Sequence, residues 1–282
     1  MSKLLKEYKY IEDKIKDIVE ILEKNKTTRY KGLYKGIATL LSPIVKNPDI
    51  LFLGINSGDG AFKEINQGKD SYDTPLRMIG EDETFINGEI DWFKKNTSRG
   101  GFVNGRWEAY EWFQRDKPIN NIFPARMIDL LYLIAEKKYP KITNNTEPIW
   151  ASECKKKIMY SNIYPIITSD TRDLYKIFSL LKEENDLKHL WENKKSLKKW
   201  DIQLFFVKLS HELVSLIKPK VIVCMGTQAF NDYTYTHNKK KSKIFTYKND
   251  NEPLVIGFSR SGNFSSLLPK LADMIFKEIN KD

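Results

Sequence analysis

The chain has 282 residues, of which 41% are hydrophobic and 12% aromatic, and its 47 lysines and arginines outnumber 37 acidic residues, for a formal charge of +10. This length buries a substantial core, and no apolar run approaches the roughly 18 residues that a membrane span needs. Charges interrupt the N-terminal stretch MSKLLKEYKYIEDKIKDIVEILEKN, which lacks the apolar core of a secretory signal. We therefore expect a cytoplasmic protein without membrane contact.

Metal-ligating side chains are scarce. The sequence holds two cysteines and three histidines, namely Cys154, Cys224, His189, His211 and His237. Two thiols cannot form a four-thiolate cluster or a disulfide framework, and the histidines show no metal-ligand spacing. We expect neither a metal nor a cofactor.

Lysines are concentrated in three short stretches, at residues 154–157, 193–200 and 237–243. Such patches favour a polyanionic partner. AT-rich coding or a requirement for solubility would also produce them, so charge alone leaves both explanations open.

The first half of the chain contains one helical pattern, one strand and a long irregular region. Apolar residues recur every three or four positions over residues 3–25, which predicts an amphipathic helix within an N-terminal extension, residues 1–46. The apolar run 50–53 lies between Pro48 and glycines and is too short for a helix, so it predicts a buried strand. Polar, glycine-rich and aromatic-rich sequence then predicts functional loops or an insertion, at about residues 62–150.

Strands and helices alternate through the second half. A helix is predicted over residues 125–139, before Pro140, and later helices are predicted at 170–185, 201–218 and 227–235. Further strands are predicted within residues 156–166 and at 220–226, and residues 252–280 are predicted to form a fourth strand, a polar loop and a closing helix. None of the four strands alternates apolar with polar residues, which is typical of a central, mostly parallel sheet covered on both faces. The predicted fold class is α/β, in a single domain spanning residues 1–282.

The first strand breaks abruptly into the polar sequence GINSGDG, residues 54–60. Its glycines permit positive φ and close backbone approach, while Asn56, Ser57 and Asp59 supply donors and acceptors. Ligands of open α/β sheets bind at the carboxyl ends of the strands. We expect the functional site there.

Four segments follow the four strands in order: GINSGDG, SNIYP, MGTQAF and GFSRSGN. Their order and context resemble the uracil-DNA glycosylase superfamily, whose first motif reads GxNPG in the mismatch-specific and single-strand-selective branches. The resemblance spans roughly residues 48–276. It implies a three-layer α/β/α fold with a four-stranded sheet, and a monomeric, monofunctional glycosylase. Such an enzyme flips a uracil or modified base out of double- or single-stranded DNA and hydrolyses its N-glycosidic bond.

By this resemblance, Asn56 positions the attacking water. An amide does not take up protons near neutral pH, but it can orient water, and departure of a base leaves an oxocarbenium-like sugar that needs only a weak nucleophile. Asp59 is the alternative water-activating group, because a carboxylate is the stronger base. Gly54 and Ser57 are expected to border the base, and Phe62 is the candidate ring for stacking on it.

Asn162 matches the family asparagine that reads the pyrimidine edge. A carboxamide offers one donor and one acceptor, which suit an adjacent carbonyl and N–H on a base. The structural alternatives are an Asx turn before Pro165 for Asn162, and a turn residue with positive φ for Asn56.

The fourth motif departs from the family. Members commonly begin this loop with His or Asn, whereas here Phe258 stands at the nearest position. The loop residues expected to contact DNA are Ser259, Arg260, Ser261 and Asn263. Arg260 is the candidate partner of a departing anion or a phosphate, and the alternative is a surface loop with one solvated arginine.

Two other readings remain open. The loss of the fourth-motif His is compatible with a catalytically weak nucleic-acid-binding protein on a glycosylase scaffold. The other alternative is a nucleotide-binding enzyme in which GINSGDG forms the phosphate loop. This segment matches neither the dinucleotide fingerprint nor the lysine-bearing P-loop. Within the glycosylase reading, the departures and the 62–150 region suggest a base bulkier than uracil.

Overall fold

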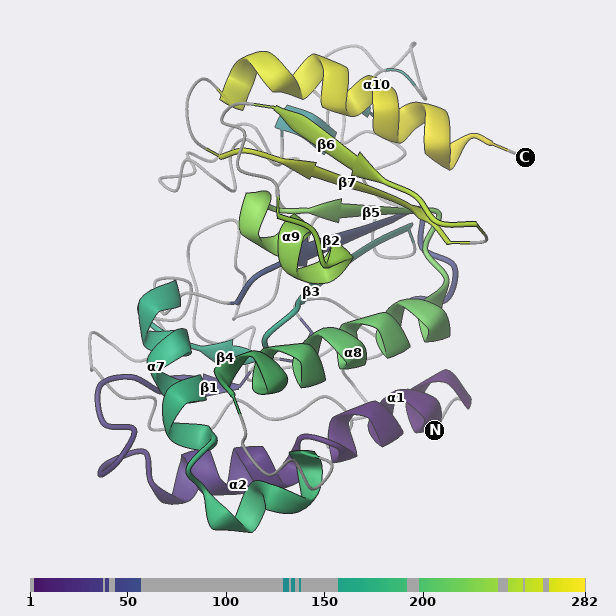
Figure 1. Cartoon of the computed structure of the whole chain (residues 1–282). Helices are drawn as coiled ribbons and strands as arrows, with labels where there is room; N and C mark the ends of the chain where they lie inside the picture. The colour runs from purple at the N-terminus through teal and green to yellow at the C-terminus, as the bar shows by residue number, and fades with distance from the viewer. Residues whose placement is uncertain are drawn as a thin grey trace, which may run out of the picture. The chain divides into compact units, whose positions relative to one another are not determined.

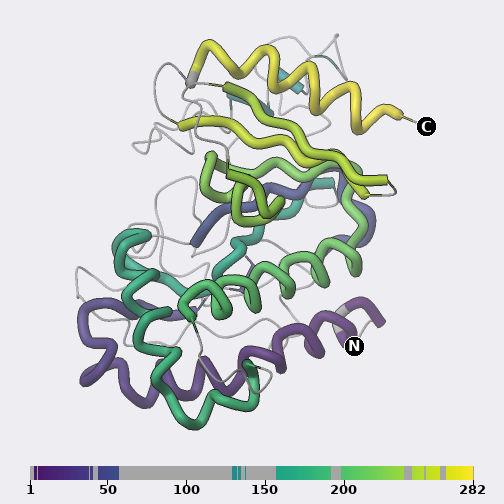
Figure 2. Tube along the Cα trace, viewed as in Figure 1, coloured from purple at the N-terminus to yellow at the C-terminus, as the bar shows by residue number. Residues whose placement is uncertain are grey.

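A computed structural model of the chain describes residues 3–37, 39–40, 44–56, 129–131, 133–134, 137, 157–191, 198–237, 243–250, 252–260 and 264–281. The chain divides into two compact units. Unit 1 comprises Met1–Leu40, Ile55–Glu89 and Asn162–Leu216, and unit 2 comprises Leu41–Gly54, Ile90–Ser161 and Ile217–Asp282. Figures 1 and 2 colour the trace from purple at the N-terminus to yellow at the C-terminus.

A five-stranded sheet forms the centre of unit 2. Its strands are β2 (Ile50–Gly54), β3 (Ile158–Asn162, whose last residue belongs to unit 1), β5 (Val221–Cys224), β6 (Ile244–Tyr247) and β7 (Leu254–Phe258). They lie in the order β3-β2-β5-β7-β6, with β2 parallel to β5 and β5 parallel to β7. Every residue of β2 and β5 is buried, which explains why these strands do not alternate in polarity. The α/β class with a mostly parallel sheet is confirmed.

The sheet has five strands where four were expected. The additional strand, β6, pairs antiparallel with β7, and Ile244 lies opposite Phe258. Only Phe245 of its four residues is buried, and the strand follows the lysine-rich stretch. An edge strand of this kind has no continuous apolar run by which to recognise it.

Two helices of unit 2 contact the sheet. The helix α9 (Thr227–Thr234) packs on β5 and β7, and α10 (Leu268–Ile279), which follows the short helix η5 (Phe264–Leu267), packs on β5. Gly257 permits the approach of α9, because a Cβ at this position would lie only 2.5 Å from Cβ of Phe230. The described residues between 129 and 137 are helical, as predicted, and Leu130, Leu131 and Ile134 are fully buried.

Unit 1 is mainly helical. Its helices are α1 (Lys3–Asp13), α2 (Lys16–Lys24), α7 (Thr171–Leu181), η4 (Asn185–Trp191) and α8 (Lys199–Ile217), and β1 (Gly36–Ile37) pairs antiparallel with β4 (Ile166–Ile167). The single helix predicted over residues 3–25 is therefore wrong. A tight turn separates α1 from α2, with the N–H of Ile15 donating to the Glu12 carbonyl at 3.0 Å. Lys14, in this turn, forms an ion pair with Glu212 of α8 at 2.6 Å.

Buried tyrosines and glutamates connect the helices of unit 1. Tyr30 donates to Glu184 at 2.8 Å and Tyr34 donates to Glu23 at 2.6 Å. Burial, followed by these carboxylates, raises the pKa of both phenols well above the ordinary value, and Tyr8 is raised in the same way by burial and by Glu12. These phenols therefore remain neutral hydrogen-bond donors in the folded protein.

Candidate functional site

The structure brings the segments that carry the two candidate asparagines together in unit 1. The chain leaves β2 at Gly54, which is buried, and the Ile55 carbonyl accepts a hydrogen bond from the N–H of Tyr164 at 2.9 Å. That bond lies one residue from Asn56 and two residues from Asn162. The side-by-side course of these segments agrees with the expectation that polar strand ends meet.

The amide of Asn56 donates to two acceptors, one of which, the Thr168 hydroxyl, donates onward. Its Nδ2 donates to Thr168 Oγ1 at 2.8 Å and to the Ile166 carbonyl at 3.4 Å, and Thr168 Oγ1 donates onward to the Asp170 carbonyl at 2.7 Å. The Asp170 carbonyl can only accept, so the Thr168 hydroxyl donates to it and accepts from Asn56. The directions of these three hydrogen bonds are therefore fixed. Oδ1 of Asn56 is consequently the side of the amide that accepts hydrogen bonds.

Asn162 ends β3 and has only 7% of its surface exposed. Its neighbour Ser161 is buried as well. A buried carboxamide stabilises the fold only when its polar atoms are hydrogen-bonded.

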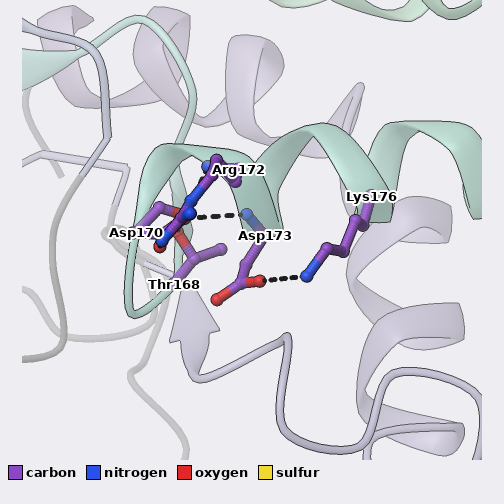
Figure 3. A network of polar contacts seen from close by, with 5 residues as sticks. All are labelled: Thr168, Asp170, Arg172, Asp173 and Lys176. Carbon is purple, nitrogen blue, oxygen red and sulfur yellow. Dashed lines mark hydrogen bonds and ion pairs between the residues drawn. The ribbon is translucent and has the colours of Figure 1, made fainter.

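A charged network begins helix α7 directly after Thr168 (Figure 3). The carboxylate of Asp170 accepts from the N–H of Arg172 at 2.6 Å and of Asp173 at 3.2 Å, which caps the helix. The same carboxylate pairs with the Arg172 guanidinium, 2.7 Å away, and this contact lowers the pKa of Asp170. Asp173 pairs with Lys176 at 2.9 Å. The carbonyl of Asp170 thus contacts Thr168, which binds Asn56, while the carboxylate of Asp170 contacts Arg172 of α7.

The β7 end in unit 2 carries Ser259 and Arg260. Ser259 is 4% exposed, and its N–H donates to the Lys243 carbonyl at 3.1 Å, so this residue offers little surface to a ligand. Arg260 packs its stem on Gly226, whose Cβ, if added, would lie 3.2 Å from Cδ of the arginine. Burial lowers the pKa of Arg260, yet the residue as a whole remains exposed and the guanidinium stays charged at neutral pH.

Phe258 is the last residue of β7 and is completely buried. It belongs to the core of unit 2 and cannot act on a leaving base. The remaining expected site residues lie outside the part of the chain that the structure describes: Ser57, Asp59, Phe62, Ser261 and Asn263.

Thr168 and Asp170 are site residues that the sequence analysis did not find. The sequence TSDT, residues 168–171, is an ordinary helix-capping signal and identifies the start of α7. Nothing in it indicates the contact with Asn56, which is 112 residues away along the chain.

Among the described residues, no group of three or more His, Cys, Asp or Glu side chains is arranged to hold a metal ion. The same part of the chain contains no helix of the length and hydropathy needed to cross a membrane. Comparison with protein-family models gives no match for this chain, and comparison with curated proteins gives none either.

Proposed function

We propose that this protein is a monofunctional DNA glycosylase that flips a uracil or a modified base out of DNA and hydrolyses its N-glycosidic bond to leave an abasic site. The observation that carries the proposal is the fixed amide of Asn56. With Nδ2 engaged by Thr168, Oδ1 accepts from the attacking water and holds it toward the anomeric carbon. No strong base is needed, because the sugar becomes oxocarbenium-like as the base departs.

In this proposal Asn162 reads the base. Its buried carboxamide pairs one donor and one acceptor with a carbonyl and an N–H of the flipped pyrimidine. Arg260, a charged residue in the loop after β7, contacts DNA phosphate. We propose that the protein acts as a monomer inside the cell, where its DNA substrate lies.

The test is incubation of the purified protein with a panel of DNAs carrying uracil, mismatches or modified bases, in single and double strands. Alkaline cleavage then reveals abasic sites. We expect one substrate class to be cleaved, and Asn56→Ala to lower the rate by about 100-fold through loss of water positioning. An Asn56→Ala variant with unchanged activity would contradict the assigned role.

Thr168 offers a matched pair of variants. Thr168→Val removes the hydroxyl that orients Asn56 and should lower the rate by about 10-fold, whereas Thr168→Ser keeps the hydroxyl and should retain most activity. Equal rates for the two variants would show that the hydroxyl does not act through Asn56. Far-UV circular dichroism confirms that each variant is folded.

The burial of Phe258 favours a second candidate function, recognition of nucleic acid without catalysis. At this position the chain presents no donor to stabilise the departing base. This alternative predicts salt-sensitive DNA binding and no abasic product from any member of the panel.

A further inference from the structure

An open pocket of about 510 Å³ in unit 1 lies beside α7 and the first turn of α8, and neither candidate asparagine lines it. The residues that matter for its chemistry are Arg172, Tyr175, Lys176, Glu183 and Lys199. Its volume is that of a small-ligand pocket, large enough for a single nucleotide. Both aromatic and cationic side chains are therefore available in one concave site.

Lys199 is the cation of this pocket that lacks a carboxylate partner among the described residues. Its Nζ lies 4.0 Å from the centre of the Tyr175 ring, in a cation–π contact. Partial burial lowers the pKa of Lys199. The ammonium group is thus held in place and has hydrogen-bond donors for an incoming anion.

The acidic residues around the pocket already have cationic partners. Glu183 pairs with Arg29 at 2.7 Å, and the carboxylates at the start of α7 pair with Arg172 and Lys176. These two cations have 87% and 63% of their side chains exposed at the edge of the pocket. Arg172 and Lys176 are neutralised by the same pairs, so Lys199 is the cation of the pocket lining that is available to an anion among the described residues.

An exposed aromatic ring lies next to Lys199 in the sequence. Trp200, at the start of α8, is 47% exposed, and Lys198 before it is exposed too. Large exposed aromatic side chains beside lysines are the combination with which proteins hold unpaired bases and their phosphates. Lys199 thus lines the pocket, and the exposed ring of Trp200 follows it in the sequence, outside the pocket lining.

We propose that this pocket binds single-stranded nucleic acid, with a phosphate on Lys199 and a neighbouring base stacked on Trp200. The inference goes beyond the glycosylase proposal and does not depend on catalysis. Arg172, which lines the pocket, is connected through Asp170 and Thr168 to Asn56 by hydrogen bonds.

The experiment measures anisotropy of a labelled ten-nucleotide oligothymidylate, without damaged bases, titrated with the full chain at low salt. Lys199→Glu should weaken binding at least about tenfold, and Trp200→Ala about five- to tenfold, the effect of losing one stacked base. Lys208→Glu, an exposed lysine on the same helix outside the pocket, is the matched charge control and should change binding less than about threefold.

Weaker oligonucleotide binding by Lys199→Glu and Trp200→Ala, but not by Lys208→Glu, supports the proposal, whatever the glycosylase assay gives. No binding by the native chain, or equal loss in Lys199→Glu and Lys208→Glu, overturns it. Competition by thymidine monophosphate or inorganic phosphate as strong as by the oligonucleotide also overturns it, since the ligand would then be a free anion. Trp200→Ala keeps the test decisive if Lys199→Glu does not fold.

Discussion

The central strands of unit 2 and the polar contacts of unit 1 bury different kinds of surface. All residues of β2 and β5 are buried and all are apolar or glycine, whereas unit 1 buries polar pairs such as Thr39 with Glu12, 2.6 Å apart. Apolar burial is non-directional, but a buried polar group stabilises the fold only with its partner in place. The central strands of unit 2 should therefore respond chiefly to lost volume, and the polar contacts of unit 1 to lost hydrogen bonds or altered ionisation.

The largest expected effect is that of Phe52→Ala in unit 2. Phe52 is fully buried and stacks on Tyr160 with ring centres 5.0 Å apart, so truncation leaves a cavity and should lower the free energy of unfolding by about 3–5 kcal/mol. Urea denaturation measures this change. Tyr10→Ala, at a residue 66% exposed in unit 1, is the control and should alter stability by less than about 0.5 kcal/mol.

Alkaline pH should destabilise both units. Unit 1 has three described tyrosines that are buried and have raised pKa values (Tyr8, Tyr30 and Tyr34), and unit 2 has Tyr233 together with the buried thiol of Cys224, whose pKa burial also raises. The unfolded chain releases phenol protons near pH 10 and the folded chain does not, so this stability is fully present below about pH 10 and falls above it. At pH 11 the loss is about 1.4 kcal/mol for each tyrosine.

Tyrosinate absorbance and circular dichroism, recorded together against pH, test this prediction. The buried phenols should ionise only as the helical signal is lost. Their ionisation near pH 10 in a protein of unchanged structure would contradict it.

Gly257→Ala tests the tight packing of unit 2. The new Cβ would lie 2.5 Å from Phe230, so β7 and α9 must separate, and the expected loss is about 1–3 kcal/mol. Gly32→Ala in unit 1 is the comparison, because Gly32 has φ +77° and no atom within 4 Å of an added Cβ. Its loss should be about 1 kcal/mol, from backbone strain alone. Thermal unfolding of both variants tests this order. A loss for Gly32→Ala that exceeds that for Gly257→Ala would show that backbone strain costs more than the steric overlap with Phe230.

A small change is expected for Tyr30→Phe in unit 1. The variant removes the 2.8 Å hydrogen bond to Glu184, but Glu184 keeps its ion pair with Arg29 at 3.3 Å. The loss should be about 1 kcal/mol, measured by urea denaturation. A loss as large as that of Phe52→Ala would show that this pair, and not the apolar core, dominates the unit.

The same difference decides how much of each unit the sequence predicts. The central strands β2, β5 and β7 lie in continuous apolar runs, and their helices carry clear periodicity, so unit 2 follows from local pattern. The edge strand β6 was missed because its residues are partly exposed. In unit 1, the break near Ile15 was missed because the apolar period continues across it.

Prediction of the site was limited in another way. Asn56 and Asn162 were selected by their places at strand ends, and the structure brings their segments together. Thr168 could not be found, because a hydrogen bond between residues 112 positions apart leaves no trace in local spacing. Likewise, the contact between Lys199 and Tyr175 of α7 could not be predicted, so the sequence alone did not distinguish Lys199 and Trp200 from other exposed residues.

The antiparallel strand β6 has a consequence for contacts between molecules. It forms one edge of the sheet, where unpaired backbone groups invite a strand from another copy to add on. This edge is only four residues long and lies between the exposed Lys243 and Lys248. Charged side chains at the ends of an edge strand oppose the edge-to-edge growth that leads to aggregation, and Lys243 and Lys248, the latter paired with Glu278 at 3.8 Å, occupy these positions.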